Sequence, residues 1–365
     1  MFKSRIINVV LITLILIIVY LVLWPVGFNP PKFLPLKTPA LVGVLKPQPI
    51  TKNMLNIKTG FGPEDVAFDH QGRMYTGLAN GWIVRTNNHL QQAENWVNTG
   101  GRPLGLAFNS KGELVVADAI KGLLSVDVNK NISLLSSEID GVAYKFIDDL
   151  AIDKNDVVYF VDSSSEYGIQ EDYVLKSFLD GRPLGRLMAY YPKSNTVEII
   201  RSNLFFPNGI TISHDQSSVL VSEMMTYRIL RISIKGSNKG DYSVFLENLP
   251  GFANNIRKSQ YNKNGYWLAL SAPRNPDVEN LQTNPFIRKI LLRLPERLLP
   301  TPKPDKYGFV VKLDDQGSLV SSIQDSTGVN AFMLTSATEY KGHLYLGSIE
   351  DTGVKKIPLI ANSHD

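Results

Sequence analysis

The sequence predicts an all-β protein, a six-bladed β-propeller that follows one N-terminal transmembrane helix. Two observations support this fold class. The first is an apolar run at residues 6–24 that contains no charged residue. The second is a pair of short strands that recurs six times after residue 60, as propeller blades do. A length of 365 residues accommodates both an anchor and one large all-β domain.

The charge-free run is long enough to cross a membrane. At about 1.5 Å per helical residue, it spans roughly the 30 Å of bilayer hydrocarbon. A cleaved signal peptide is the alternative, but its apolar region usually has about 7–15 residues and a small-residue cleavage site follows it. Lys3 and Arg5 precede the run, and the next basic residue is Lys32. The positive-inside rule therefore predicts a single-pass protein with a cytoplasmic N-terminus, an anchor within residues 1–24 and an extracytoplasmic propeller.

A proline-rich stalk is expected between the anchor and the propeller. Residues 25–50 contain prolines at positions 25, 30, 31, 35, 39, 47 and 49. This density disfavours helix and sheet and suits an extended spacer. The propeller is then predicted to occupy residues 51–365.

Six segments share one pattern, in which an apolar strand, a short polar turn and a second apolar strand follow a polar or glycine position. The first five begin at residues 64, 104, 148, 208 and 254, so the intervals are 40, 44, 60 and 46 residues, and the sixth lies near Ser336. A four-stranded propeller blade takes about 40–50 residues. Six blades are therefore predicted, with a β-sandwich of similarly spaced hairpins as the alternative.

Two blades contain extra residues. Residues 164–182 are expected to form a loop in the third blade, and residues 272–306 an insertion in the fifth. Within this insertion, residues 285–295 combine apolar side chains such as Phe286 and Ile290 with Arg288 and Lys289, which suits a short amphipathic helix. Such a helix either caps a blade edge or dips into the membrane surface.

The composition excludes several kinds of chemistry. A formal net charge of +4 and the lack of dense Lys/Arg runs argue against a nucleic-acid partner. The chain has 0 Cys, which excludes disulfides, thiolate nucleophiles and Cys-ligated metals. The 5 His show no HxH or HExxH spacing, and no GxSxG motif occurs, so zinc and a serine nucleophile are disfavoured. Only oxygen ligands remain for a metal.

Polar residues recur where the first strand of each repeat begins. In repeat order, the position before that strand is occupied by Glu64, Leu104, Asp148, Asn208 and Asn254, and the next position by Asp65, Gly105, Asp149, Gly209 and Asn255. The sixth register is ambiguous between Thr335 and Ser336. Singly, each Asn or Asp suits a turn. In a propeller the innermost strands surround a channel, so the column becomes a ring of oxygens.

Such a ring matches the ligand preference of Ca²⁺, which takes six to eight oxygen ligands. The predicted ligands are Glu64, Asp148, Asn208, Asn254 and Asn255. Without a metal, the carboxylates of Glu64 and Asp148 would repel each other in the channel.

Longer motifs extend from residue 60 to the C-terminal region. They are Gly62-Pro63-Glu64-Asp65, Lys145-Phe146-Ile147-Asp148-Asp149-Leu150, Tyr159-Phe160-Val161-Asp162-Ser163-Ser164-Ser165, Asp172-Tyr173, Gly185-Arg186-Leu187, Leu204-Phe205-Phe206-Pro207-Asn208-Gly209, Glu247-Asn248-Leu249-Pro250-Gly251-Phe252, Asn254-Asn255-Ile256-Arg257 and Gly342-His343-Leu344-Tyr345-Leu346-Gly347-Ser348. In these motifs the chain resembles the strictosidine synthase-like and adipocyte plasma membrane-associated protein family. That family is part of a wider group of calcium-dependent six-bladed propellers that includes gluconolactonases and paraoxonases.

The resemblance implies that the polar column supplies the ligands of a catalytic calcium. In some members of the wider group, paraoxonases among them, the acids that follow the first and third ligands hold a second, structural calcium. The corresponding acids here are Asp65 and Asp149.

Three positions depart from the wider group. The third and fifth repeats usually read Asn-Asp and Asp-Asn, whereas here they read Asp148-Asp149 and Asn254-Asn255, which leaves the summed ligand charge unchanged. Leu104 stands where paraoxonases carry a catalytic His, so that base is not carried over. Thr335 stands where strictosidine synthase uses a Glu, so alkaloid condensation is not expected.

The function predicted from these residues is calcium-dependent hydrolysis of small-molecule esters or lactones, as by an arylesterase or lactonase. The metal would polarise the carbonyl and stabilise the oxyanion, while Asp148 either directs water as a catalytic carboxylate or serves only as a ligand. The alternative is a non-enzymatic, membrane-anchored propeller with a structural calcium that binds a ligand or a protein partner across its top face.

Overall fold

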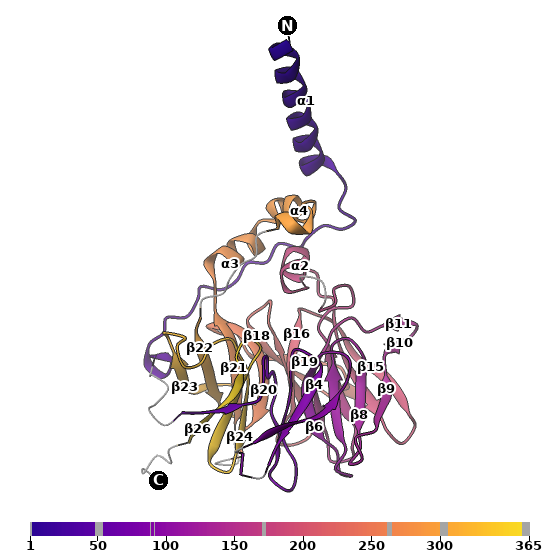
Figure 1. The fold of residues 1–365 in the computed structure, drawn as a ribbon, viewed down its shortest axis with the longest axis vertical. Coiled ribbons are helices and arrows are strands. Elements are labelled where there is room, and N and C mark those ends of the chain that lie inside the picture. The colour runs from indigo at the N-terminus through magenta and orange to yellow at the C-terminus, as the bar shows by residue number, and fades with distance from the viewer. Residues whose placement is uncertain are drawn as a thin grey trace.

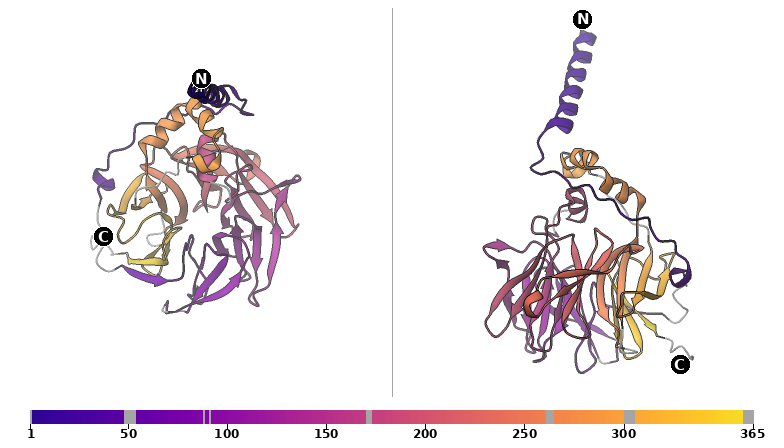
Figure 2. Two further views of the ribbon diagram at one scale, coloured as in Figure 1. Left: turned by 45° about the horizontal axis from the view of Figure 1, so that its top comes forward. Right: turned by 180° about the vertical axis from the view of Figure 1, so that it is seen from behind.

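Six four-stranded antiparallel sheets surround a central axis and form a β-propeller (Figures 1 and 2). The computed structural model describes residues 2–47, 54–87, 89–90, 92–169, 173–260, 265–299 and 306–359. Asp172, part of one resemblance motif, lies outside the described residues, as do residues 48–50 of the predicted stalk and 300–305 of the predicted insertion. The predicted all-β, six-bladed fold is confirmed.

The first three blades follow one another along the chain, each with its innermost strand first. Blade 1 contains β2 (Ala67–Phe68), β3 (Met74–Gly77), β4 (Trp82–Thr86) and β5 (Ala93–Asn98). Blade 2 contains β6 (Pro103–Phe108), β7 (Leu114–Asp118), β8 (Gly122–Val126) and β9 (Ile132–Ser136). A small hairpin of β10 (Glu138–Ile139) and β11 (Val142–Ala143) precedes blade 3, which contains β12 (Ile147–Ile152), β13 (Val158–Asp162), β14 (Gly185–Tyr191) and β15 (Thr196–Leu204).

The last three blades complete the ring. Blade 4 contains β16 (Pro207–Ile212), β17 (Ser218–Glu223), β18 (Arg228–Ser233) and β19 (Tyr242–Leu246). Blade 5 contains β20 (Gly251–Lys258), β21 (Tyr266–Pro273), β22 (Gly308–Leu313) and β23 (Leu319–Asp325). Blade 6 contains β24 (Leu334–Tyr340), β25 (His343–Ser348), β26 (Gly353–Pro358) and, as its outermost strand, β1 (Leu55–Lys58).

The ring is closed by a strand from the opposite end of the chain. β1 pairs antiparallel with β26, with Ile57 opposite Val354 and Leu55 opposite Lys356. Both ends of the propeller therefore contribute to one sheet. The sequence pattern did not predict that the short strand β1 takes part in it.

The polar turns between the first two strands of the repeats have a common structure. Asp69 Oδ1 accepts hydrogen bonds from the backbone N of Gln71 at 3.0 Å and of Arg73 at 2.9 Å. Asn109 and Asp153 make the same pair of contacts in blades 2 and 3. Asn and Asp side chains stabilise turns in this way, so this polar residue fixes the turn that aligns the two inner strands in blades 1, 2 and 3.

The core of the propeller lies between neighbouring blades. For example, Val161 and Leu187 of blade 3 pack with Ile210 and Val221 of blade 4, and all four side chains are buried. Inner strands such as β17 are buried at every position because blades cover both of their faces, whereas in the outer strand β5 four of six residues are exposed. This explains why the inner strands read as continuous apolar runs.

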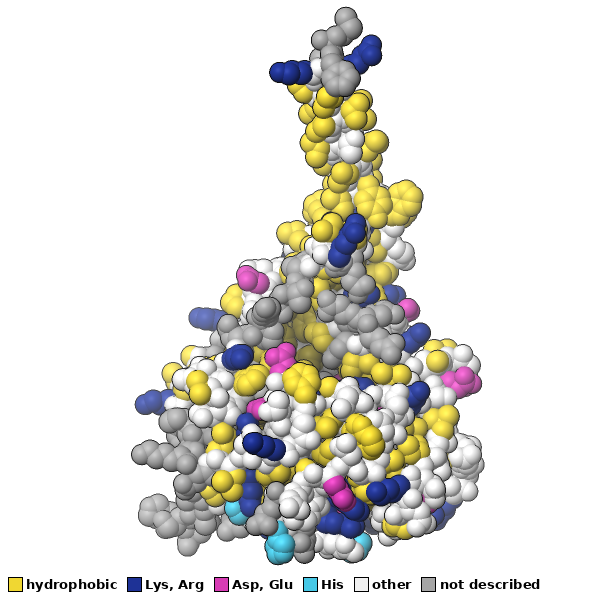
Figure 3. Space-filling model, viewed as in Figure 1, with side chains coloured by type: hydrophobic (Ala, Val, Ile, Leu, Met, Phe, Trp, Pro, Cys, Tyr) yellow, Lys and Arg dark blue, Asp and Glu magenta, His cyan; other side chains and the backbone are white. Residues whose placement is uncertain are grey.

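The helix α1 (Phe2–Leu23) projects away from the propeller, and its apolar surface is exposed (Figures 1 and 3). Residues Arg5–Leu23 form a helix that is long and apolar enough to cross a membrane, a test that a signal sequence near the N-terminus also passes. At the C-terminal end of α1, Arg293 donates from Nε to the carbonyl of Trp24 at 2.6 Å and from Nη1 to that of Leu21 at 2.8 Å. These bonds satisfy helix-terminal carbonyls that have no intrahelical partner.

The segment after α1 runs along the propeller. Apart from the 3₁₀ turn η1 (Gly43–Leu45), residues 25–47 form neither helix nor strand. Arg274 Nη2 donates to the carbonyl of Leu36 at 2.7 Å, and Gln324 Nε2 donates to that of Leu45 at 2.7 Å. The predicted stalk is therefore hydrogen-bonded to blade 5 and its insertion, and does not project as a free spacer.

Five helical segments lie in the loops of blades 3, 4 and 5 among the described residues. Between β13 and β14 lies α2 (Tyr173–Asp180), and between β18 and β19 lies the 3₁₀ turn η2 (Gly236–Asn238). Between β21 and β22 lie α3 (Pro276–Thr283), α4 (Pro285–Leu292) and the 3₁₀ turn η3 (Glu296–Leu298). The helices α2, α3 and α4 lie on the face of the propeller from which α1 projects (Figure 1).

The helix α4 forms where the amphipathic pattern predicts a helix, but it does not simply bury its apolar side chains against the propeller. Arg288 is 1% exposed, and its guanidinium donates to the carbonyls of Phe178 and Pro31. Phe286 is 54% exposed and Ile287 is 42% exposed. The N-terminal turn of α4 thus presents apolar side chains outward while a charged one is buried, because backbone carbonyls of α2 and of residues 25–47 accept hydrogen bonds from both of its Nη atoms.

Candidate metal centre in the propeller channel

A β-bulge interrupts the innermost strands at the predicted polar column. The pairing register shifts between residues 103 and 106 in β6, 147 and 150 in β12, 207 and 210 in β16, 253 and 256 in β20, and 334 and 336 in β24. A bulge places two consecutive residues opposite one residue of the partner strand and redirects their side chains. It explains how both members of the pairs Asp148-Asp149 and Asn254-Asn255 are buried, although a regular strand would point them to opposite faces.

The structure brings most of the predicted ligands to one cavity. Glu64, Asp148, Asn208 and Asn254 all line it, although they come from four different blades. Asn208 Nδ2 donates to Asp148 Oδ2 at 2.9 Å. Asn255 Nδ2 donates to Glu64 Oε1 at 3.0 Å, which joins this fifth residue to the group. The repeat alignment therefore located residues that converge in space.

Three oxygens of this group are buried and have no hydrogen-bond partner among the described residues. They are Glu64 Oε2, Asn208 Oδ1 and Asn255 Oδ1. An unpartnered buried oxygen costs free energy, and several together indicate that something else binds them. Carboxylate and carboxamide oxygens are the ligands that Ca²⁺ takes, so these residues fit such an ion.

The electrostatics of the group also suit a cation. Burial, and then the neighbouring charge of Asp65, raises the pKa of Glu64 well above its usual value. Burial and the charge of Asp149 raise the pKa of Asp148. Both pKa shifts have the same two causes: the carboxylates are removed from water, and they lie close to other carboxylates. A bound cation would offset this penalty.

The ligand set is rich in amides. Among the described residues, no cluster of three or more His, Cys, Asp or Glu side chains converges on a point as a metal site. Glu64 and Asp148 are the acids that line the cavity, and asparagines supply the other predicted side-chain oxygens. The predicted set instead combines two carboxylates with three carboxamides, and Ca²⁺ takes both kinds of oxygen ligand.

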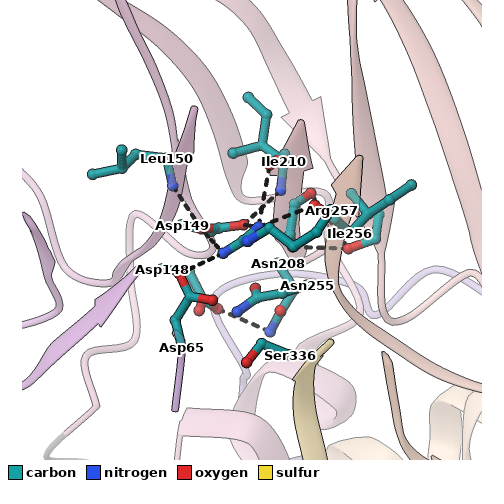
Figure 4. A network of polar contacts seen from close by, with 12 residues as sticks. Asp65, Asp148, Asp149, Leu150, Asn208, Ile210, Asn255, Ile256, Arg257 and Ser336 are labelled. Carbon is teal, nitrogen blue, oxygen red and sulfur yellow. Dashed lines mark hydrogen bonds and ion pairs between the residues drawn. The ribbon is translucent and has the colours of Figure 1, made fainter. Parts of the chain in front are cut away.

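The two other predicted ligands, Asp65 and Asp149, do not line the cavity. Both are fully buried, and both bind the guanidinium of Arg257 on β20 (Figure 4). Arg257 Nη2 lies 2.7 Å from Asp65 Oδ2 and 2.8 Å from Asp149 Oδ1, and Nη1 lies 2.7 Å from Asp149 Oδ2. Arg257 belongs to a resemblance motif, but the repeat alignment gave it no role because it lies two residues beyond the polar column.

Hydroxyl groups connect the inner strands of neighbouring blades around the channel. Ser163 Oγ donates to the carbonyl of Pro207 at 2.6 Å and lies 3.0 Å from Asp148 Oδ2. Ser222 Oγ donates to the carbonyl of Asn254 at 2.7 Å. Sequence reasoning missed these two serines, because Ser222 lies on the second strand of its blade and Ser163 directly after one, both outside the aligned column.

The ambiguous sixth repeat also reaches the column. Thr335 Oγ1 and Ser336 Oγ both donate to the carbonyl of Glu64, at 2.6 Å and 2.9 Å. Thr335 lines the cavity as well. Blade 6 therefore fixes the backbone of Glu64 and contributes a hydroxyl where blades 1, 3, 4 and 5 contribute acids or amides.

Apolar side chains form the walls above this polar floor. The cavity has a volume of about 290 Å³. Its lining includes Leu104, Phe146, Phe206, Met224 and Phe252 from the blades, and Leu175, Phe178, Leu179, Val278 and Leu281 from α2 and α3. Leu104, the position without a His, thus serves as an apolar wall. The cavity lies between the channel and the helices, on the face from which α1 projects (Figure 1).

A family model described as strictosidine synthase matches residues 148–237, and one described as strictosidine synthase-like, N-terminal, matches residues 53–86. The sequence is similar to protein strictosidine synthase-like 4 of Arabidopsis thaliana, with 34% identity over 308 residues that cover 82% of this chain and 79% of the relative. It is similar to the adipocyte plasma membrane-associated protein of Homo sapiens, with 33% identity over 360 residues that cover 92% and 83%.

Solved structures share the fold at much lower identity. A gluconolactonase of Xanthomonas campestris has a TM-score of 0.61 at 12% identity, covering 84% of this chain and 88% of that chain. A calcium-binding protein, regucalcin, of Agrobacterium tumefaciens has a TM-score of 0.60 at 11% identity, covering 85% and 94%. At these identities the likeness concerns the fold, and the chemistry must be argued from the residues.

Proposed function

The chain belongs to the strictosidine synthase-like family, and we propose that it is a membrane-anchored, calcium-dependent hydrolase of esters or lactones. The observation that carries this proposal is a set of three unpartnered oxygens, on Glu64 and Asn208, which line an apolar-walled cavity, and on Asn255, which is hydrogen-bonded to Glu64. The fold shared with a gluconolactonase and a regucalcin is consistent with it.

The residues that would hold the ion are Glu64, Asp148, Asn208, Asn254 and Asn255. When bound, calcium supplies a Lewis acid that polarises a carbonyl oxygen. Asp148 is placed to orient a water molecule, since Asn208 donates to its Oδ2 at 2.9 Å and fixes the carboxylate, with Ser163 Oγ 3.0 Å from the same oxygen. Its other oxygen, Oδ1, is left to accept a proton from that water.

The cavity walls define the class of substrate. Aromatic and aliphatic side chains surround the polar floor, so the group that flanks the carbonyl is apolar. An ester or lactone with an alkyl or aryl substituent satisfies both parts of the cavity. Such compounds also partition to membranes, and α1 projects from the same face (Figure 1).

The proposed topology places the N-terminus in the cytoplasm and the propeller on the other side of the membrane. Lys3 and Arg5 lie at the outer end of α1, and basic side chains mark that end of the hydrophobic column (Figure 3). The same arrangement directs the face that carries α2, α3 and α4 toward the bilayer.

Turnover of aryl esters and aliphatic lactones by the purified chain, with and without a calcium chelator, tests the proposal. We expect hydrolysis that the chelator abolishes and added calcium restores. Calcium binding without turnover of either class would instead favour the non-enzymatic propeller with a structural ion. Turnover that the chelator leaves unchanged would refute the metal mechanism.

A further inference from the structure

We propose that the guanidinium of Arg257 takes the place of a second cation between Asp65 and Asp149, so that the channel binds one calcium ion and not two. The three residues come from blades 1, 3 and 5. Arg257 Nη2 bridges the two acids, at 2.7 Å from Asp65 Oδ2 and 2.8 Å from Asp149 Oδ1. The guanidinium therefore occupies the point on which both carboxylates converge (Figure 4).

Asp149 has little capacity left for a metal. Its Oδ1 accepts from the backbone N of Leu150 at 2.8 Å, and its Oδ2 accepts from that of Ile210 at 2.8 Å. Each oxygen also accepts from Arg257. A calcium ion at this position would have to displace the guanidinium, and it would compete with backbone donors for the same lone pairs.

Asp65 is less saturated but cannot hold an ion alone. Its Oδ2 accepts from Arg257 and from the backbone N of Leu106 at 3.1 Å, and its Oδ1 has no partner among the described residues. One free carboxylate oxygen falls far short of the six to eight ligands that Ca²⁺ takes.

Arg257 is itself held in place. Besides the two acids, Nη1 contacts the carbonyls of Ile256 at 3.0 Å and Ile210 at 3.4 Å, and the side chain is 15% exposed. A guanidinium stays charged at all physiological pH values and matches carboxylates with two parallel bonds. It therefore provides a permanent positive charge that needs no metal supply.

The neighbouring group of residues has the opposite character. Glu64, Asn208 and Asn255 each have an unpartnered oxygen and no cationic partner in the described ion pairs, whereas Asp65 and Asp149 beside them share the guanidinium of Arg257. The structure thus separates a place that requires an ion from one that already contains its equivalent. That the first group requires an ion rests on the proposed function, whereas the pairing of Asp65 and Asp149 with Arg257 does not.

Counting calcium ions on the full-length chain tests the assignment. Detergent-purified protein is dialysed against buffered calcium, and bound metal is measured by elemental analysis and by calorimetric titration. We expect one calcium per chain for the unmodified protein and two for Arg257→Met, which keeps bulk but leaves both acids uncompensated. The matched control, Arg257→Lys, keeps the charge and is expected to bind one.

The outcomes separate the two proposals. Two calcium ions on the unmodified protein, or no gain in a folded Arg257→Met, would overturn the role of Arg257. No calcium on the unmodified protein and one on Arg257→Met would support that role while refuting the proposed metal centre. If Arg257→Met does not fold, Asp149→Asn decides: calcium binding should stay at one ion, whereas loss of an ion would mean that Asp149 is a ligand.

Discussion

Asn255 in blade 5 donates a hydrogen bond from Nδ2 to Oε1 of Glu64 in blade 1 at 3.0 Å. The two blades are not neighbours, so this contact crosses the channel and leaves one oxygen of each side chain, Oε2 and Oδ1, without a partner. A cation bound by those two oxygens would give each of them the partner that it lacks. The contact therefore makes Glu64 the most direct place to test for metal binding.

Glu64→Gln should weaken calcium binding by more than tenfold, because it removes one of the two carboxylates from the ligand set. Mutating a residue that only supports a metal ligand already costs about 10–100-fold in affinity, and loss of a ligand should cost at least as much. Thermal unfolding measured over a calcium series reads this out, since an ion at 100 times its Kd stabilises the folded state by about 2.7 kcal/mol. Glu113→Gln, the same change in the turn between β6 and β7, is the control. An equal calcium response in both variants would count against the metal centre.

Gly209→Ala should disturb the metal centre without changing any ligand. A Cβ at residue 209 would lie 2.4 Å from Asn255 Cα and 2.5 Å from the Asn254 carbonyl oxygen, both in the neighbouring blade. Overpacking of this kind typically costs about 1–3 kcal/mol, and here it displaces β20 from β16.

We expect lower thermal stability together with weaker calcium binding. Gly27→Ala, where no atom lies within 4 Å of the added Cβ, is the control. A variant of Gly209 that loses stability but binds calcium normally would show that the spacing of these strands does not set the ligand positions.

Arg186→Met should strongly destabilise blade 3. Arg186 binds Asp162, whose side chain is 0% exposed and which also accepts from the backbone N of Phe146 at 2.9 Å. Removing one partner of a buried ion pair leaves an uncompensated charge, which costs about 3–5 kcal/mol.

Denaturant unfolding measures this cost. Arg85→Met breaks an ion pair in which Glu94 is 59% exposed, and such pairs contribute at most about 1 kcal/mol. Similar losses in the two variants would indicate that Asp162 is protonated or solvated in the folded state, contrary to the pairing described above.

Changing both Phe286 and Ile287 to Ser should weaken membrane binding of a chain that lacks residues 1–24. Both side chains are exposed on α4, which contacts the C-terminal end of α1 through Arg293. Transfer of such side chains from water contributes about 1.5–3 kcal/mol each, so vesicle partitioning should fall by more than tenfold.

Sedimentation with phospholipid vesicles reads out this partitioning, and deletion of residues 284–296 should have the same effect. Val128→Ser, at a residue 75% exposed in blade 2, is the control because it lies on no helix of the α1 face. Unchanged binding of the double variant would show that α4 only caps the propeller.

Much of this architecture could be predicted because it repeats. Strand pairs that recur at blade length fix the fold class, and equivalent positions of Glu64, Asp148, Asn208 and Asn254 must converge once the ring exists. What the pattern could not predict occurs once. Arg257 lies outside the column register and finds its partners in two other blades, and no periodicity reports such a contact.

The helix α4 shows a second limit of sequence patterns. An amphipathic pattern indicates which residues share a face, but not which face is buried. Arg288 is buried because carbonyls of Phe178 and Pro31, distant in sequence, are available to it. The closing strand β1 was missed for a related reason, since four residues carry too little pattern to be assigned a partner some 300 residues away.

The pairing of β1 with β26 also affects how the protein is made. Residue 58 leaves the ribosome long before residue 353, and at about 5–20 residues per second the interval is roughly 15–60 s. During that time the first strand has no partner, although the anchor before it has already been synthesised. Closure of the ring thus waits for the last strand, so a nascent chain that stops within blade 6 carries an open edge that another strand can bind.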